Sequence, residues 1–291
     1  MIAPGVLILS AFMFWPFLQA FHKSFFNYNG RSVDIFVGID NYVDLWQNTA
    51  FLRSLLTGLT LTIWFVAISI VVPLLVAWLI HHMRSERVRY AFRIAVMVPA
   101  VVPTVVGYLL WLRFLSPDGA VNTALRGIGL DVLAVNWLGD PSTALFGLML
   151  VGFPWLNGIN TLLFLAAFSH ISRDIYESAE IDGARRGRVF FQIELPAVWP
   201  QVQVLAVIAV ILGLQNYENV FIITGGGPQD STLVPGLLLF RTAFTYGQFG
   251  YANAIGVTIF LIILGLLMLM NAGRVAPIVR RLVKERNDSR A

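Results

Sequence analysis

The chain has 291 residues, of which 57% are hydrophobic and only 12% are charged, with a net charge of +4. Soluble domains carry about twice that share of charged residues, so this composition excludes an ordinary soluble protein. The absence of cysteine excludes disulfides, iron–sulfur clusters and thiolate metal sites. The basic excess does not indicate nucleic-acid binding, because membrane proteins concentrate lysine and arginine in their cytoplasmic loops.

Long apolar runs predict an all-α integral membrane protein with six transmembrane helices in a single domain, residues 1–291. A helix needs roughly 20 apolar residues to cross a bilayer core of about 30 Å. The first run lacks the basic start and short apolar core of a signal peptide, so we expect a retained helix and leave open a short basic leader before Met1. The six predicted spans are residues 2–21, 54–80, 94–112, 142–168, 200–223 and 251–271.

The distribution of basic residues predicts the orientation. Fourteen of the twenty lysines and arginines fall in segments 81–93 and 169–199 and in the tail after residue 271, while six fall in the opposite loops. Cytoplasmic loops are the ones enriched in basic residues. We therefore expect both termini on the cytoplasmic side.

Proline recurs inside the predicted spans, at Pro73, Pro99, Pro103 and Pro154. Each removes a backbone hydrogen bond, which lipid cannot replace but protein or a water-filled cavity can. Pro99 and Pro103 are one turn apart, so they predict a deformable third helix whether the kinks serve packing or line a path. The apolar stretch 233–244 is too short to span and is expected to be re-entrant or interfacial.

The spans lack the side chains that catalysis or ion coupling would need. Glu218 is their one clear ionisable candidate, whereas transporters driven by protons or sodium usually show more. The stretches GARRGR and TGGGPQDST lack the GxxxxGK[ST] spacing of a P-loop, so the chain cannot hydrolyse ATP alone. We interpret His81 and His82 as caps at the end of a span rather than metal ligands, and expect no metal or cofactor in this chain.

A charged segment, YESAEIDGARRGRVFFQIELP at residues 176–196, separates the fourth and fifth spans. Asp174 is placed to cap a short first helix, and Gly183 stands where the end of that helix needs positive φ. A second helix is expected from Ala184 until Leu195-Pro196 ends it. The whole loop is longer than two neighbouring spans need, which favours docking of a partner over the alternative of a plain solvated loop.

This segment resembles the EAA loop of permease subunits in binding-protein-dependent ABC importers. That loop reads EAA, two residues, DGA, a phenylalanine six residues on, and then I-x-LP. Ser178 replaces the middle alanine, which is a change between small residues. The resemblance implies a cytoplasmic coupling loop, residues 169–199, whose ATPase-coupling residues are Glu177, Ser178, Ala179, Asp182, Gly183, Ala184 and Phe190.

Two further stretches narrow the resemblance. TGGGPQDST, followed by FGYANAIG, is similar to the last two helices of carbohydrate permeases of the maltose and glycerol-phosphate type, and FVGIDNYVDL to their first outer loop. The chain looks like the maltose-F-like member of a permease pair. The resemblance implies the type I ABC importer permease fold, a bacterial or archaeal inner membrane, a second homologous permease, two subunits that use ATP and Mg²⁺, and an extracytoplasmic sugar-binding protein.

Two polar clusters are candidates for a sugar path. Amides suit sugar hydroxyls and aromatic rings suit sugar faces, and buried amides need hydrogen-bond partners. The alternative is that these amides hold neighbouring helices together, with Glu218 in an ion pair. The clusters are WLNGIN, with Trp155, Asn157, Gly158 and Asn160, and QNYEN, with Gln215, Asn216, Tyr217, Glu218 and Asn219.

The leading hypothesis is therefore a non-catalytic subunit of an ATP-driven sugar importer that works by alternating access in a lipid bilayer. An importer of a sugar phosphate such as glycerol phosphate would need cations along the path, and no span interior shows one. A membrane enzyme acting on lipid-linked sugars would need carboxylates at one membrane face, which only the acids of residues 174–194 could supply. A channel would not need a docking loop.

Overall fold

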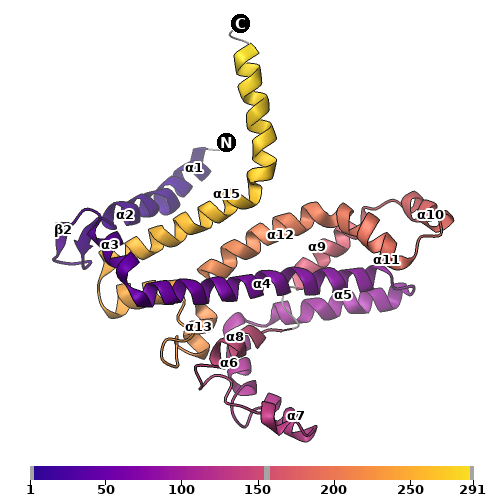
Figure 1. The fold of residues 1–291 in the computed structure, drawn as a ribbon, viewed down its shortest axis with the longest axis horizontal. Coiled ribbons are helices and arrows are strands. Elements are labelled where there is room, and N and C mark those ends of the chain that lie inside the picture. The colour runs from indigo at the N-terminus through magenta and orange to yellow at the C-terminus, as the bar shows by residue number, and fades with distance from the viewer. Residues whose placement is uncertain (1–2, 154–157, 289–291) are drawn as a thin grey trace. The chain divides into compact units, whose positions relative to one another are not determined.

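The computed structural model describes residues 3–153 and 158–288, with side chains up to residue 270. The chain is mostly helical and forms two compact units, one from the residues up to Leu52 with those from Leu238 onward, the other from Arg53 to Leu237 (Figure 1). Within the described ranges, four helices are long and apolar enough to cross a membrane, or five if a bent pair counts as one span. The chain is thus a multi-pass membrane protein, while the count of six spans stays a prediction.

The first unit begins with an exposed apolar helix. Residues 3–23 form this helix, which has no buried side chain and is long and apolar enough to cross a membrane. Phe17 packs edge-on against Phe260, with 5.1 Å between the ring centroids. The elements of this unit are α1 (Ala3–Leu9), the π-helical turn η1 (Ser10–Phe14), α2 (Trp15–Lys23), β1 (Phe26–Tyr28), β2 (Asp34–Phe36), α3 (Asp40–Gln47), the π-helical turn η4 (Arg241–Thr245) and α15 (Phe249–Asp288).

A small hairpin adds two short strands to this otherwise helical fold. β1 and β2 pair antiparallel, with Phe26 opposite Phe36. Asn29 holds the turn, because its side-chain oxygen accepts three backbone N–H groups at 3.0 Å each. Asn41 in α3 donates to the carbonyl oxygens of Ser24 and Phe26 at 2.8 and 3.0 Å. The stretch that resembles a first outer loop, residues 36–45, therefore runs from the end of β2 into α3. The hydrogen bonds of Asn41 hold α3 against the start of the hairpin.

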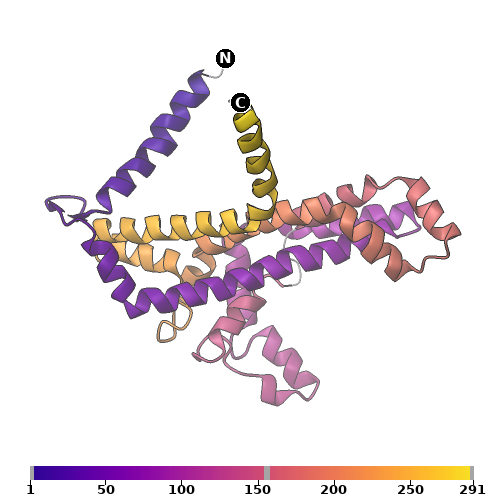
Figure 2. The same cartoon turned by 45° about the horizontal axis from the view of Figure 1, so that its top comes forward.

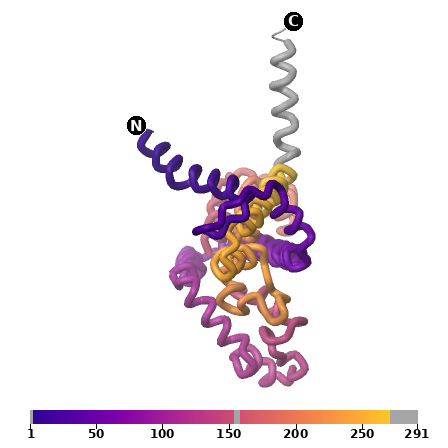
Figure 3. The backbone as a smooth tube through the Cα atoms, turned by 90° about the vertical axis from the view of Figure 1, so that its left-hand side faces the viewer, coloured from indigo at the N-terminus to yellow at the C-terminus, as the bar shows by residue number. Residues whose placement is uncertain are grey.

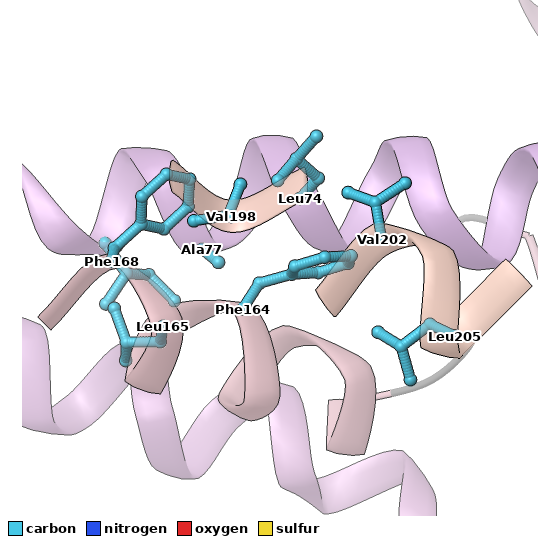
Figure 4. Close-up of a cluster of buried hydrophobic side chains, with 9 residues drawn as sticks. Leu74, Ala77, Phe164, Leu165, Phe168, Val198, Val202 and Leu205 are labelled. Atoms are coloured by element: carbon cyan, nitrogen blue, oxygen red, sulfur yellow. The ribbon is translucent and has the colours of Figure 1, made fainter. Parts of the chain in front are cut away.

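The second unit has one core, formed where three helices pack together. These helices are α4 (Thr49–His81), of which the part from Arg53 belongs to this unit, the shorter α9 (Gly158–Ser169) and α12 (Leu195–Gln215). Phe164 and Phe168 of α9 are fully buried and lie among aliphatic side chains of α4 and α12 (Figure 4). The remaining core members are Leu74, Ala77, Ile80, Leu165, Val198, Val202 and Leu205.

This unit contains further elements besides these three helices. In Figure 2, α10 lies beyond the end of α4, and α7 belongs to a separate lobe that Figure 3 shows from another side. These elements are α5 (Glu86–Val101), α6 (Thr104–Phe114), α7 (Ala120–Gly127), the 3-10 turn η2 (Asp131–Leu133), α8 (Ala144–Leu150), α10 (Arg173–Ile181), α11 (Arg186–Val189), the π-helical turn η3 (Phe190–Glu194), α13 (Glu218–Ile223) and α14 (Pro235–Phe240).

The third predicted span is sharply bent. The break between α5 and α6 turns the chain by 91°. It falls at Val102, whose extended backbone precedes Pro103, because a residue before proline avoids the helical region. The paired prolines therefore coincide with a break in the third predicted span, while its deformability stays a prediction.

The fourth and fifth predicted spans are also interrupted. α8 ends at Leu150 and Gly152 has a φ of +81°, so the fourth is not one continuous helix, while Pro154 lies outside the described residues. The fifth stops at Gln215, and Asn216 is extended before α13 begins. Asparagine side chains compete for backbone hydrogen bonds, which makes this polar stretch a natural place for a break.

Close packing of α9 on α5 depends on the lack of a side chain at Gly158. A β-carbon there would lie 2.0 Å from the carbonyl oxygen of Val96. We expect Gly158→Ala to lower the free energy of unfolding by about 1–3 kcal/mol, since overpacking forces the two helices apart. Unfolding of the purified chain in detergent measures this loss.

Gly107→Ala is the matched control, because nothing lies within 4 Å of an added β-carbon on that glycine of α6. Alanine favours a helix over glycine by roughly 0.5–1 kcal/mol, so this variant should be as stable as the parent or slightly more so. An equal loss in both variants would contradict the packing role of Gly158.

Candidate functional site

Residues 172–194 contain one short helix and the start of a second helix, separated by a tight turn. The first, α10, begins after Ser172, which has the extended backbone of an N-cap residue. The prediction that Asp174 is the cap is wrong, since Asp174 already lies within the first turn. Its carboxylate is still favourably placed, because a negative charge near a helix N-terminus complements the helix dipole.

The turn after α10 depends on Gly183. This residue has a φ of +67°, which confirms the predicted left-handed conformation. Its N–H bonds to the carbonyl of Glu180 at 3.0 Å, and the N–H of Ala184 to that of Ala179 at 2.9 Å. Crossed bonds of this kind satisfy the last carbonyls of a helix and end it sharply.

The second helix does not end at Leu195-Pro196, so that prediction is wrong. α11 continues through η3 into α12, giving one helix from Arg186 to Gln215. The π-helical turn before the proline carries a bond from the Leu195 N–H to the Phe190 carbonyl, and a proline can follow it without breaking the chain of turns. The predicted coupling segment is therefore continuous with a helix that is long and apolar enough to cross a membrane.

A groove of about 440 Å³ lies between α10 and the second helix. Its walls include four of the predicted coupling residues, Ser178, Ala179, Asp182 and Ala184. Glu177 and Gly183 are exposed beside it, and the ring of Phe190 packs inward against Trp78, 5.5 Å between centroids. Three large apolar side chains of the same segment are exposed: Ile175, Ile181 and Phe191. A polar groove flanked by exposed apolar side chains suits a protein partner.

A buried carboxylate ties this segment to the end of α4. The Glu194 side chain has 0% exposure, and one of its oxygens accepts from Trp78 Nε1 at 2.8 Å. The other oxygen accepts from the Tyr176 hydroxyl at 3.0 Å and lies 3.1 Å from His82 Nε2. One side chain thus joins α10, α12 and the end of α4.

The contacts of His82 favour its protonated form. The second ring nitrogen of His82, Nδ1, lies 3.0 Å from the carbonyl oxygen of Trp78, so both nitrogens face acceptors. Neutral imidazole has one donor, whereas the protonated ring has two. The hydrogen bond to Glu194 raises the pKa of His82. Burial raises the pKa of Tyr176, and its neutral hydroxyl stays a donor.

This cluster is not evident from the sequence. The sequence places His81 and His82 at the end of a span, and Glu194 occupies a variable position of the loop pattern. One signal was available, because Glu194 lies in the stretch FFQIELP next to an apolar helix, and a carboxylate there needs partners. Which residues supply those partners depends on the fold, since Trp78 is 116 positions away.

A second feature of this unit is a pocket of about 100 Å³, lined mainly by apolar side chains together with a few polar ones. Asn216, at the break between α12 and α13, and Asn219, in the first turn of α13, line it together with Trp64 of α4 and Tyr108 of α6. The indole N–H of Trp64 bonds to the Met149 carbonyl at 2.7 Å, which fixes the ring. A pocket of this size holds only a few water molecules, so a sugar requires its walls to separate.

The other predicted path residues lie elsewhere. Asn160 donates to the carbonyl of Ser69 at 2.9 Å and so joins α9 to α4, as the helix-packing alternative expects. Gly158 lines a neighbouring hollow of about 410 Å³, which shares Tyr108 with the pocket. Gln215 and Glu218 are exposed and Tyr217 is half-buried, while Trp155 and Asn157 lie outside the described residues.

Comparison with protein families identifies the fold. The model of the family described as "Binding-protein-dependent transport system inner membrane component" matches residues 47–281. The chain belongs to this family. The resemblance found in the sequence is thereby confirmed, together with the type I importer permease fold.

Individual relatives agree with the family. The chain is 34% identical to the diacetylchitobiose uptake system permease protein NgcF of Streptomyces coelicolor, over 87% of the chain and 74% of that protein. It is 31% identical to the multiple sugar-binding transport system permease protein MsmF of Streptococcus mutans, over 90% and 89%. A bacterial alginate ABC transporter, solved with an alginate pentasaccharide-bound periplasmic protein, contains a chain with a TM-score of 0.81 and 26% identity, covering 94% of this chain and 91% of that one.

The left-handed turn in this permease sets a limit at Gly183. An added β-carbon has nothing within 4 Å, so the cost of Gly183→Ala is conformational, about 1 kcal/mol in the free energy of unfolding. Gly183→Asn should cost less, because asparagine tolerates this conformation. Thermal unfolding in detergent measures both.

Gly187→Ala is the matched control for this turn. Gly187 lies in α11 with equally open surroundings, so alanine should leave stability unchanged or raise it. A similar loss at Gly187 and Gly183 would show that the conformation of the turn is not what limits substitution.

The titration of His82 makes the free energy of unfolding depend on pH. Free histidine titrates near pH 6.5, and the folded pKa of His82 is raised. The pairing with Glu194 is therefore fully present below about pH 6.5 and is lost as pH rises through the raised pKa. Arg186 opposes this effect and His81 stacks on His82, but neither reverses its sign. We expect the unfolding temperature to fall between about pH 6 and pH 9.

His82→Gln should flatten that pH dependence, whereas His22→Gln, outside the cluster, should keep it. Unfolding temperatures measured across the pH range for the three proteins decide the matter. The same slope in all three would place the titrating group elsewhere.

Proposed function

We propose that this chain is the transmembrane, non-catalytic permease subunit of an ATP-driven importer of sugars or oligosaccharides. The observation that carries the proposal is the family match over residues 47–281, joined to relatives named for diacetylchitobiose and multiple sugars. A lactose transport system permease protein, LacF of Rhizobium radiobacter, is 30% identical over 90% of the chain. Relatives of this kind favour carbohydrate over a sugar phosphate such as glycerol phosphate.

In this proposal the chain forms half of a translocation path with a second homologous permease. Two ATP-binding subunits supply hydrolysis of ATP with Mg²⁺, and an extracytoplasmic binding protein delivers the sugar. The alginate transporter solved with a periplasmic protein supports the last of these partners. The groove between α10 and the second helix, with the predicted coupling residues Glu177 to Phe190, is the docking site for an ATPase subunit.

The proposed topology keeps six spans with both termini in the cytoplasm. Residues 3–23, α4 and α15 each span alone. The bent pair α5–α6, the pair α8–α9 and the pair α12–α13 supply the other three. Alternating access then uses the breaks within these pairs as the points at which the path opens.

One helix links docking to the path. It begins at Arg186 beside the groove and ends at Gln215, directly before the asparagines of the pocket. Thirty residues at 1.5 Å each reach about 45 Å. A displacement at the groove therefore reaches the pocket through a single rigid element.

A membrane enzyme is the alternative from another class. It needs carboxylates that converge on a substrate, and in residues 174–194 the acids Asp174, Glu177, Glu180 and Asp182 are exposed along the segment. Glu194 is buried and bonded to three donors. The described part of the chain holds no group of three or more side chains that could bind a metal.

The proposal predicts that the pocket asparagines select the sugar. With the partner subunits and binding protein in vesicles, Asn216→Ala and Asn219→Ala should each lower uptake of the preferred sugar roughly tenfold, since a site built to bond a hydroxyl loses about 1–3 kcal/mol without its partner. Uptake of a panel of labelled disaccharides and oligosaccharides, with ATP hydrolysis measured in parallel, provides the test.

Asn160→Ala is the control, because its amide bonds to the Ser69 carbonyl rather than to the pocket. This variant should be less stable but should keep the order of preference among sugars. If the wild-type complex accumulates none of the sugars in an ATP-dependent manner, the proposed function is wrong. If it does and all three variants keep the same preference, the pocket is not the path.

A further inference from the structure

Glu194 is a buried carboxylate, and apolar packing alone does not explain why a charged side chain lies at this position. A carboxylate without exposed surface loses its hydration and is retained only where donors replace the water. Here the donors come from two other segments, Trp78 and His82 at the end of α4 and Tyr176 in α10. Glu194 itself belongs to the helix that runs from Arg186 to Gln215. The contact thus joins three segments by directional bonds.

Helix α10 buries few of its own side chains. Ala179 is the buried side chain of this helix, and Tyr176 is half-buried. The ring of Tyr176 lies 6.2 Å from that of His81, which in turn lies 5.7 Å from Phe168 of the core. Small buried area gives α10 weak non-directional attachment, so the bond from Tyr176 to Glu194 is the specific link between α10 and the long helices.

The ends of α4 and α12, which lie beside the carboxylate of Glu194, are closely packed. Trp78 packs against Phe190 at 5.5 Å and against His82 at 5.1 Å, between ring centroids. Ile80 of α4 and Val198 of α12 are part of the buried core. The ends of α4 and α12 are therefore packed together, and Glu194 lies at their junction.

We propose that Glu194 is a positioning residue for energy coupling: its carboxylate locks α10 to the joined ends of α4 and α12, so that movement of α10 on an ATPase subunit moves both membrane helices. The proposal rests on the proposed function, because it assigns α10 to the ATPase docking site. It adds a role for a residue outside the groove, since Glu194 does not line it.

The test uses the complete complex in vesicles, with the binding protein and a transported sugar. Glu194→Gln keeps the size of the side chain but removes its charge, and Tyr176→Phe removes one hydroxyl. We expect Glu194→Gln to lower the sugar transported per ATP hydrolysed roughly tenfold, and Tyr176→Phe to lower it less, while both retain the ATPase subunits on co-purification. Tyr90→Phe, on an exposed tyrosine of α5, is the matched control and should not change the ratio.

A double variant separates coupling from general stability. If the hydroxyl acts through the carboxylate, Tyr176→Phe combined with Glu194→Gln loses no more than Glu194→Gln alone. Additive losses, an unchanged ratio of sugar to ATP in both single variants, or loss of the ATPase subunits from the complex each overturn the proposal. A wild-type complex that transports no sugar would instead contradict the proposed function.

Discussion

Inside a bilayer no water is present to bond a free backbone N–H or carbonyl, and this constraint accounts for most of the arrangement of the second unit. Its helices break at Val102, near Gly152 and at Asn216, and each of these residues lines a hollow in the protein. Polar backbone is thus freed where protein groups or water can satisfy it. A helix can change direction at these breaks. The proposed alternating access therefore uses the same residues at which backbone hydrogen bonds are lost.

Residues 172–194 follow a different principle, because most of this segment is exposed and water can bond to its backbone. What needs an explanation there is order rather than interruption. A crossed pair of hydrogen bonds around Gly183 ends α10 sharply, and the continuous helix from Arg186 carries the segment into the membrane. Between them Glu194 supplies a fixed polar contact in an otherwise thinly packed region. The proposed mechanism therefore assigns docking, attachment and transmission to three different parts of one short stretch of sequence.

The sequence predicted what depends on local pattern. Apolar runs indicated a membrane protein, paired prolines indicated the bent third helix, and Gly183 indicated a left-handed turn. Failures came where tertiary contacts decide. The cap fell on Ser172 because the backbone turns there, the helix passed through Leu195-Pro196 because a π-helical turn precedes it, and the partners of Glu194 lie up to 116 positions away. The polar stretch after Gln215 was read as helix, although its asparagines favour the break that forms there.

The continuous helix from Arg186 to Gln215 also restricts how the length of this chain can vary. One inserted residue in a helix turns everything after it by about 100° and advances it by 1.5 Å. An insertion there would point the asparagines away from Trp64 and Tyr108 while leaving the groove as it is. Insertions in the hairpin turn after Asn29 or in the lobe around α7 would not rotate these asparagines. We therefore expect the number of residues in this helix to be restricted, whereas the hairpin turn and the lobe around α7 can vary in length.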